Sequence, residues 1–330
     1  MSSCGIKSRK RENVTTPHLI FVGHIGGHTG LARVGDNLLL RLQDRWRVTV
    51  VGISVPTKYD GPFTVVPACF MQDWVGRLVT RRLCLDDPPD VVCVMLDPDM
   101  VPWFYPYIPQ GIPVCAVMPV DNQNLKDAAQ LSRLDAAIFL THWGQQEAAR
   151  GGFHGPAHVM PLGVDTTVYA PQDRHAARTE LGLPDGFIFG NVNKNQPRKR
   201  FDVTLLAFRE FLRRSGAQDA WLYCYCQPHD IGWDLPQLAA YWGLADRVLL
   251  PKENMASLEV PTEDAMPLIY STLDVQMSTS QGEGWGLTTM EGMACGVPQI
   301  IPEYAALSEW PGAAALTVRV SHPIVTTSGT

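Results

Sequence analysis

The segment from Ser278 to Glu303, STSQGEGWGLTTMEGMACGVPQIIPE, contains the residue types and spacings best suited to ligand chemistry. An apolar strand should end near Ser278, and three glycines then precede a helix expected to begin near Leu287 and to stop at Gly296. Glycines let a ligand approach the backbone, and a helix start offers unpaired N–H groups at the positive end of the helix dipole. The pattern therefore predicts a phosphate site.

Two carboxylates frame this predicted phosphate site. Glu283 precedes the helix and Glu291 falls within its first turns, with seven residues between them. Because a carboxylate repels phosphate, we expect both to accept hydrogen bonds from neutral hydroxyls beside the phosphates, and sugar hydroxyls are the natural partners. For Glu291 taken alone, a position on a solvated helix face is the open alternative.

The string E-G-W-G-L-x-x-x-E-G-M-A-C-G-V-P resembles the E-x7-E signature of retaining, nucleotide-sugar-dependent glycosyltransferases of family four, which have the GT-B fold. The resemblance implies that Glu283 contacts the donor sugar and Glu291 the ribose. It also implies that backbone N–H groups of Gly286, Leu287 and Thr288 hold the diphosphate of a UDP or GDP donor.

A second segment, GNVNKNQPRKRFDVTLLAF, places a basic cluster between an apolar strand and an amphipathic helix. Its cations are Lys194, Arg198, Lys199 and Arg200. Such a cluster can neutralise a diphosphate both in the ground state and as it leaves. The family pattern is a basic residue, usually Arg, followed several positions later by Lys, which matches Lys194 and Lys199. Since Lys stands at the first position, the sequence leaves open whether Lys194 or Arg198 touches phosphate, and a solvated basic face is the alternative.

Two segments of the first half carry further candidates. Gly26 and Gly27, before a helix, resemble the glycine-rich first loop of the family, which lies under the donor phosphates; a turn that only lets the helix pack is the alternative. Asp121 follows the fifth expected strand, where the family commonly has His. Its expected role is open between accepting a sugar hydroxyl and holding a turn. Glu283, Lys199 and Asp121 form the predicted catalytic set.

Asp97-Pro98-Asp99 matches the D-x-D that chelates a divalent metal in the other large glycosyltransferase fold. In this chain the basic cluster and the helix start can neutralise a diphosphate. We therefore expect a metal-independent protein without a cofactor, with the nucleotide-sugar as a co-substrate.

Hydrophobic patterning predicts the elements that position these residues. Apolar, β-rich runs and helical spacings alternate from Ile20 onward, and the pattern restarts at Phe187. Strands that are apolar on both faces and linked by helices imply parallel sheets. The predicted fold class is α/β, with two Rossmann-like, doubly wound domains facing a cleft, and the family resemblance implies that this fold is of GT-B type. We expect a disordered tail over residues 1–17, an acceptor domain over 18–171 and a donor domain over 172–330. Because proteins of this fold continue beyond the E-x7-E helix, the C-terminal domain is expected to be shortened.

The composition limits the class of protein. With 45% hydrophobic and 18% charged residues, the 330-residue chain is typical of folded proteins. The formal net charge of −6 argues against a general basic surface for nucleic acid. No apolar run approaches the roughly 20 residues that span a bilayer. Several cysteines, such as Cys93 and Cys224, lie in apolar stretches, which is typical of reduced thiols. A cytoplasmic location is expected, with peripheral membrane association left open.

The predicted reaction moves a sugar from a nucleoside diphosphate sugar to an acceptor hydroxyl with retention of the anomeric configuration, as in a retaining hexosyltransferase. Electrostatic stabilisation of the departing diphosphate should supply most of the catalysis. The expected acceptor is a glycan or small molecule first, a lipid-linked sugar second and modified DNA third, and a homo-oligomer is left open. The alternatives are a sugar-nucleotide epimerase or phosphorylase of the same fold, or a non-catalytic sugar-nucleotide-binding module.

Overall fold

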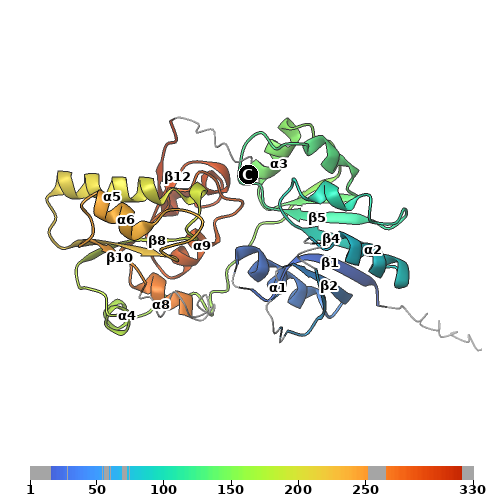
Figure 1. Cartoon of the computed structure of the whole chain (residues 1–330), viewed down its shortest axis with the longest axis horizontal. Helices are drawn as coiled ribbons and strands as arrows, with labels where there is room; N and C mark the ends of the chain where they lie inside the picture. The colour runs from blue at the N-terminus through green and yellow to red at the C-terminus, as the bar shows by residue number, and fades with distance from the viewer. Residues whose placement is uncertain are drawn as a thin grey trace, which may run out of the picture. The chain divides into compact units, whose positions relative to one another are not determined.

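Helices and strands alternate along the chain in the computed structural model, as the hydrophobic pattern predicts (Figure 1). The structure describes residues 16–27, 29–53, 55, 59, 61–68, 73, 75–251 and 265–321. The predicted tail over residues 1–17 therefore lies almost wholly outside the described residues. None of the described helices is both long enough and apolar enough to cross a lipid bilayer.

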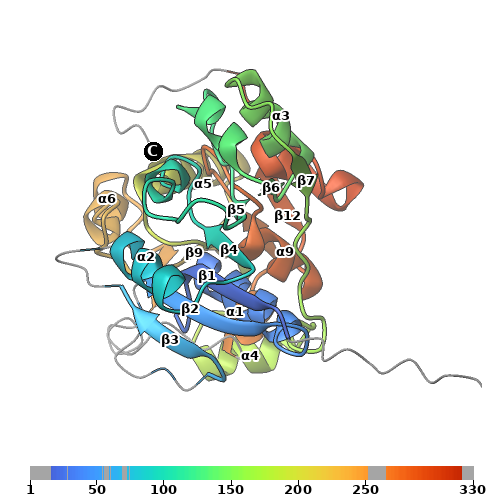
Figure 2. The same cartoon turned by 90° about the vertical axis from the view of Figure 1, so that its right-hand side faces the viewer.

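The first sheet has seven strands in the order β3-β2-β1-β4-β5-β6-β7. Its strands are β1 (His18–His24), β2 (Arg47–Ile53), β3 (Thr64–Pro67), β4 (Val91–Met95), β5 (Val114–Met118), β6 (Ala136–Phe139) and β7 (Ala157–Val159). β1 pairs in parallel with both β2 and β4, so the strand order reverses between β1 and β4, as in a doubly wound sheet. Figure 2 shows β3, β2 and β1 side by side.

The second sheet has six parallel strands in the order β10-β9-β8-β11-β12-β13. Its strands are β8 (Phe187–Val192), β9 (Ala220–Tyr225), β10 (Val248–Leu249), β11 (Val275–Met277), β12 (Gln299–Pro302) and β13 (Ala315–Val318). The order reverses between β8 and β11, so this sheet is also doubly wound. The predicted α/β class with two Rossmann-like sheets is confirmed.

Eight α-helices are described, and several begin at side-chain caps. They are α1 (Gly30–Leu42), α2 (Arg77–Asp86), α3 (His142–Arg150), α4 (Arg174–Leu181), α5 (Phe201–Ser215), α6 (Leu235–Tyr241), α8 (Met266–Ser271) and α9 (Leu287–Ala294). Short 3₁₀ helices are η1 (Val101–Phe104), η2 (Ala128–Arg133), η3 (Pro197–Lys199), η5 (Ala305–Ser308) and η6 (Gly312–Ala314). Thr141, Asp173 and Asp234 accept a backbone N–H at the starts of α3, α4 and α6, which satisfies donors that a helix start leaves unpaired.

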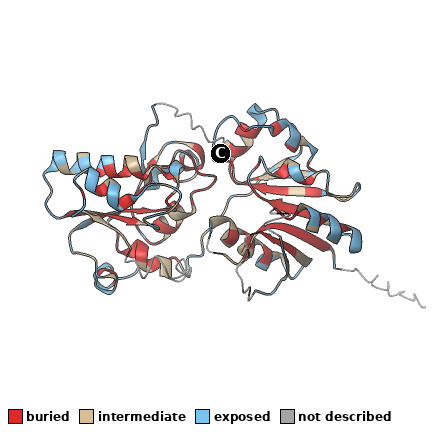
Figure 3. Cartoon of the chain, in the orientation of Figure 1, coloured by how far each residue is buried: buried red, intermediate tan, exposed pale blue. Residues whose placement is uncertain are grey.

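Alternation along β9 builds the core on both faces of the second sheet. Leu222 and Cys224 pack with α5 and α6 residues on one face, while Tyr223 packs on the other against Tyr270 of α8. Figure 1 shows α5 and α6 on one side of this sheet and α8 on the other. The strands are buried while the outer side of α5 is exposed (Figure 3). The described cysteines are free thiols.

Two compact units divide the chain. Among the described residues, the first holds those up to Gly27, Leu31–Met95 and Trp103–Cys115, and the second holds Thr29, Gly30, Leu96–Pro102 and those from Ala116 onward. The second unit thus contains the whole six-stranded sheet together with β6, β7 and α3. The predicted domain boundary between residues 171 and 172 stays a prediction.

Candidate functional site

The basic segment predicted from the sequence follows β8 directly. A single 3₁₀ turn, η3, separates this strand from α5, and Arg200 joins the two helices with a φ of +52°. This left-handed conformation turns the chain sharply between η3 and α5. The same turn leaves Arg198 and Lys199 at the end of a buried parallel strand, where α/β sheets bind ligands.

Lys199, Arg198 and Glu283 form a charged cluster in the second unit. The Lys199 ammonium donates to Oε1 of Glu283, and both side chains are buried, with 8% and 11% of their surface exposed. Nη1 of Arg198 lies 3.5 Å from the other carboxylate oxygen, Oε2, and donates to the Gly282 carbonyl at 2.6 Å. The structure therefore brings Glu283 to two consecutive cations that lie more than 80 positions away in the sequence.

The charges of this cluster keep Glu283 ionised. Burial alone would raise the pKa of its carboxyl, but Lys199, Arg198 and hydrogen bonds from Lys199 and Ser280 outweigh it, so the pKa lies below its ordinary value. Burial lowers the pKa of the Lys199 ammonium against the pull of Glu283. A buried carboxylate with two cations beside it can accept hydrogen bonds from hydroxyl groups at neutral pH.

Two further carboxylates approach Arg198 from the ends of neighbouring strands β4 and β5. Oδ2 of Asp121 lies 3.5 Å from Nε of Arg198. Asp97 keeps contact with solvent, yet the protein around it desolvates its carboxyl and, with the charges of Asp121 and Asp99, raises its pKa to about 6. Arg198 is thus shared between Glu283 and Asp121. Metal independence stays a prediction.

A chain of buried hydrogen bonds holds the backbone of the basic segment in place. Nδ2 of Asn193 donates to Asn191, whose Nδ2 donates to Oγ1 of Thr204 at 2.8 Å. The Thr204 and Thr279 hydroxyls lie 2.7 Å apart, and Thr279 donates to the carbonyls of Lys199 and Arg200. These polar residues are buried or nearly so, and their network fixes the turn that carries Lys199. Sequence reasoning missed them, because isolated Asn and Thr residues in apolar elements carry no distinctive spacing.

The glycines of the turn before α9 pack against protein backbone. A Cβ on Gly282 would lie 1.7 Å from the Asp121 carbonyl oxygen, and one on Gly284 would lie 2.5 Å from Pro119. Gly286 adopts a φ of +93° at the N-cap of α9, a conformation that favours glycine. Close approach to a ligand was the predicted use of these glycines. In the structure, Gly282 and Gly284 admit the segment that follows β5, and close approach of a ligand to this turn stays a prediction.

The start of α9 is where the sequence predicts it. The helix begins at Leu287, so the N–H groups of Leu287 and Thr288 belong to its first turn and have no carbonyl of their own helix to donate to. Glu291 lies one turn further and is buried, not solvated: its Oε2 accepts a 2.7 Å hydrogen bond from the Tyr270 hydroxyl. Tyr270 belongs to α8 and was not predicted as a site residue.

Three predicted residues are not members of the charged cluster. Lys194 is exposed on the loop after β8. Gly26 and Gly27 belong to the first unit, where the Gly26 N–H donates to Oδ2 of Asp36 at 2.9 Å and Gly26 takes a φ of +66°. This contact ties the loop after β1 to α1, as the packing alternative expects. Donor-phosphate binding by these glycines stays a prediction.

The two doubly wound sheets define the chain as a protein of GT-B fold. The sucrose-phosphate synthase of Thermosynechococcus elongatus superposes with a TM-score of 0.70 at 18% identity, over 92% of this chain and 86% of that chain. Anabaena HepE, solved in complex with UDP-glucose, gives a TM-score of 0.65 at 15% identity, over 88% and 82% of the two chains. The predicted GT-B fold is confirmed.

Sequence similarity points to the same class of protein. The chain is 35% identical over 169 residues to the D-inositol 3-phosphate glycosyltransferase of Nocardia farcinica, and 33% identical over 155 residues to that of Rhodococcus opacus. The matches cover 49% and 45% of this chain and 36% and 33% of these relatives, so the chain spans about a third of their length. No family model matches the chain. The predicted relationship to glycosyltransferases of GT-B fold is confirmed.

Proposed function

We propose that the protein is a retaining hexosyltransferase, which moves a sugar from a nucleoside diphosphate sugar to an acceptor hydroxyl. The observation that carries the proposal is the Lys199–Arg198–Glu283 cluster beside the start of α9, at the carboxyl ends of parallel strands. The cations and the first N–H groups of α9 suit the negatively charged diphosphate, and the ionised carboxylate suits the hydroxyl groups of the sugar.

Each group has a separate role in the proposed reaction. Lys199, Arg198 and the first N–H groups of α9 stabilise negative charge on the diphosphate as the bond to the anomeric carbon breaks. Glu283 accepts hydrogen bonds from hydroxyl groups of the transferred sugar and so orients it, and Glu291 binds the ribose of the nucleotide.

Retention follows if the acceptor attacks from the side that the diphosphate leaves. The acceptor hydroxyl bonds to the anomeric carbon, the bond from that carbon to the diphosphate oxygen breaks, and the departing oxygen takes the acceptor proton. This route needs no protein nucleophile, and the electron pair of the broken bond stays on the diphosphate.

A UDP-sugar is the first donor to test. Two solved structures with this fold, Anabaena HepE and a trehalose-6-phosphate protein of E. coli, are described with UDP-glucose and UDP-2-fluoro glucose. The curated relatives are named for D-inositol 3-phosphate, which makes inositol derivatives the first acceptors to try.

The test incubates the protein with a panel of UDP- and GDP-sugars without acceptor, with and without EDTA. We expect ligand-dependent thermal stabilisation and slow donor hydrolysis that EDTA leaves unchanged. Epimerised product would instead indicate an epimerase, and binding without turnover would indicate a binding module. Arg198→Gln should weaken donor binding, while Lys194→Gln on the same loop measures the contribution of the exposed cation.

A further inference from the structure

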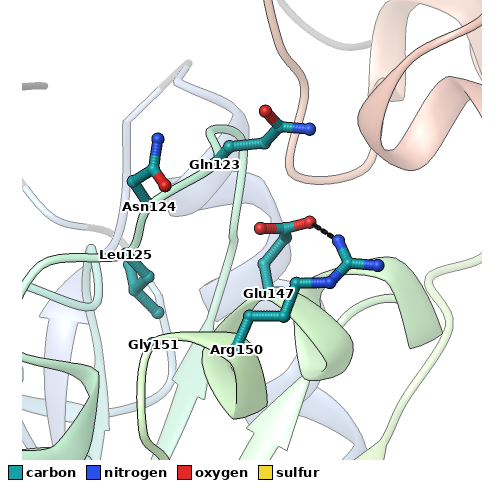
Figure 4. A pocket seen from close by; sticks show the side chains of 6 residues that line it. All are labelled: Gln123, Asn124, Leu125, Glu147, Arg150 and Gly151. Carbon is teal, nitrogen blue, oxygen red and sulfur yellow. Dashed lines mark hydrogen bonds and ion pairs between the residues drawn. The ribbon is translucent and has the colours of Figure 1, made fainter.

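A polar pocket of about 430 Å³ lies at the end of α3, in the second unit. Its lining comes from the loop after β5 and from the last turn of α3. The lining residues are Gln123, Asn124, Leu125, Glu147, Arg150 and Gly151. Figure 4 shows the Glu147 and Arg150 side chains paired on the helix, with Gln123 and Asn124 on the loop beside them.

Glu147 is the buried group of this pocket, with 4% of its side chain exposed. Its Oε1 pairs with Nη1 of Arg150, whose side chain is 64% exposed. Within the described part of the chain, Oε2 accepts no hydrogen bond. Figure 4 shows Oε1 paired with Arg150 and the other carboxylate oxygen, Oε2, turned away from that arginine. Because Glu147 lines the pocket, Oε2 offers an acceptor to a ligand or to water there.

The loop that faces Glu147 is held in a fixed shape. Asn124 has a φ of +58°, which Asn tolerates better than most residues, and this turn lets its amide line the pocket. At the end of α3, a Cβ on Gly151 would lie 2.8 Å from the Leu125 carbonyl oxygen, so glycine there lets the loop pack onto the helix. The backbone that carries Gln123 and Asn124 is therefore held against the end of α3.

We propose that this pocket binds the acceptor, and that the bound part is an uncharged, hydroxyl-rich group such as a sugar ring or a cyclic polyol. This inference rests on the proposed transferase function and names the class of acceptor. Oε2 of Glu147 accepts a hydroxyl proton, and the amides of Gln123 and Asn124 both donate to and accept from neighbouring hydroxyls. Arg150 cancels the charge of Glu147, so the pair as a whole is neutral, and a phosphate would face a buried carboxylate.

The pocket adjoins the charged cluster through the loop after β5. Gln123 follows Asp121 by two residues, so their Cα atoms lie at most about 7 Å apart. Asp121 in turn contacts Arg198, which contacts Glu283. Tyr304, after β12, lies near both the pocket and Asp121. Its hydroxyl forms a hydrogen bond with the Gln123 backbone, and burial together with the charges of Glu147 and Asp121 raises the pKa of that hydroxyl. A ring in the pocket can thus direct a hydroxyl toward the donor side of Asp121.

The experiment titrates the full chain with myo-inositol and D-glucose, and separately with D-inositol 3-phosphate, by isothermal calorimetry in the absence of donor. Glu147→Gln keeps the shape and can still accept from Arg150, but it replaces a charge-assisted hydrogen bond with a neutral one. We expect it to weaken binding of a neutral probe about fivefold or more. Gln123→Ala removes an exposed side chain that lines the pocket and should also weaken binding of the neutral probe. Glu180→Gln, the same change on the exposed face of α4, should leave the affinity unchanged.

UDP-glucose is titrated into the same samples, so that the two proposals fail separately. If UDP-glucose binds but no neutral probe does, or if Glu147→Gln and Glu180→Gln bind equally, the pocket proposal is overturned and the donor site stands. Tighter binding of the phosphorylated probe, strengthened by Glu147→Gln, would also overturn it. If Glu147→Gln weakens the binding of a neutral probe but the protein binds no sugar nucleotide, the pocket proposal is supported and the transferase proposal is contradicted.

Discussion

Lys199 and Glu283 should stabilise the fold only as a pair, and Lys199→Met tests this directly. The side chains are 8% and 11% exposed, so Met leaves a carboxylate buried without its closest cation. Breaking a buried pair costs about 3–5 kcal/mol. Arg198 stays 3.5 Å from Oε2 of Glu283, which favours the lower end, about 3 kcal/mol. Against a typical stability of about 5–15 kcal/mol, the variant should still fold.

Glu283→Gln alone should cost a similar amount, because it leaves a buried ammonium without a carboxylate. Additive effects would then total about 6 kcal/mol in the double variant, whereas a coupled pair predicts about 3 kcal/mol or less, a coupling of about 3 kcal/mol. Urea unfolding at pH 7, followed by circular dichroism, measures all three variants. Lys194→Met, an exposed cation on the same loop, should stay within about 0.5 kcal/mol of the wild type.

Acid should remove this coupling. The folded pKa of Glu283 lies below its unfolded value, so its stabilisation is present above about pH 4.3 and is lost as the pH falls through the folded pKa. The stability gap between wild type and Glu283→Gln should therefore shrink below pH 4. Additive single effects at pH 7, or a gap that does not depend on pH, would refute the ion pair as the link between the two loops.

Three other predictions concern stability. Gly282→Ala should lose about 2–3 kcal/mol on urea unfolding because its Cβ meets a backbone oxygen at 1.7 Å, whereas Gly163→Ala, with open space around it, should change little; equal effects would contradict the packing role. Tyr270→Phe should cost about 1–3 kcal/mol by removing a buried donor from Glu291, and an unchanged urea midpoint would count against that bond. Desolvation raises the pKa of Asp97 to about 6, so its stabilisation relative to Asp97→Asn should be full below about pH 4 and lost as the pH rises through 6; thermal melts that run parallel from pH 4 to 8 would disprove this.

The sequence predicted the long elements well, because their hydrophobic patterns are strong. Both series of strands, and the start of α9 at Leu287, follow from apolar runs and glycine signals. β7 and β13 were missed: they have three and four residues, and most of these are not buried, so no apolar run marks them. Apolar residues at helical spacing over residues 70–83 predict a helix there. The described helix α2 begins at Arg77, where Asp73 accepts the N–H groups of Leu78 and Val79; residues 70–72 and 74 lie outside the described residues.

The candidate site was only partly predictable. Spacing singled out Glu283, Glu291 and Lys199, since each lies in a dense local motif. Their actual partners are distant in sequence: Tyr270 meets Glu291, and the Asp121 backbone fills the space beside Gly282. Such contacts depend on which strands become neighbours in the sheet, and single-residue patterns do not encode that.

The most direct test of the central claim is the initial rate at which a sugar nucleotide is consumed by the wild type and by Glu283→Gln, with circular dichroism confirming that both are folded. The account predicts that at least one UDP- or GDP-sugar is consumed by the wild type, and that Glu283→Gln slows this about a hundredfold or more, as the loss of a group that orients and stabilises the transition state does. A folded wild type that neither binds nor consumes any of these donors, or equal rates for the two proteins, would contradict it.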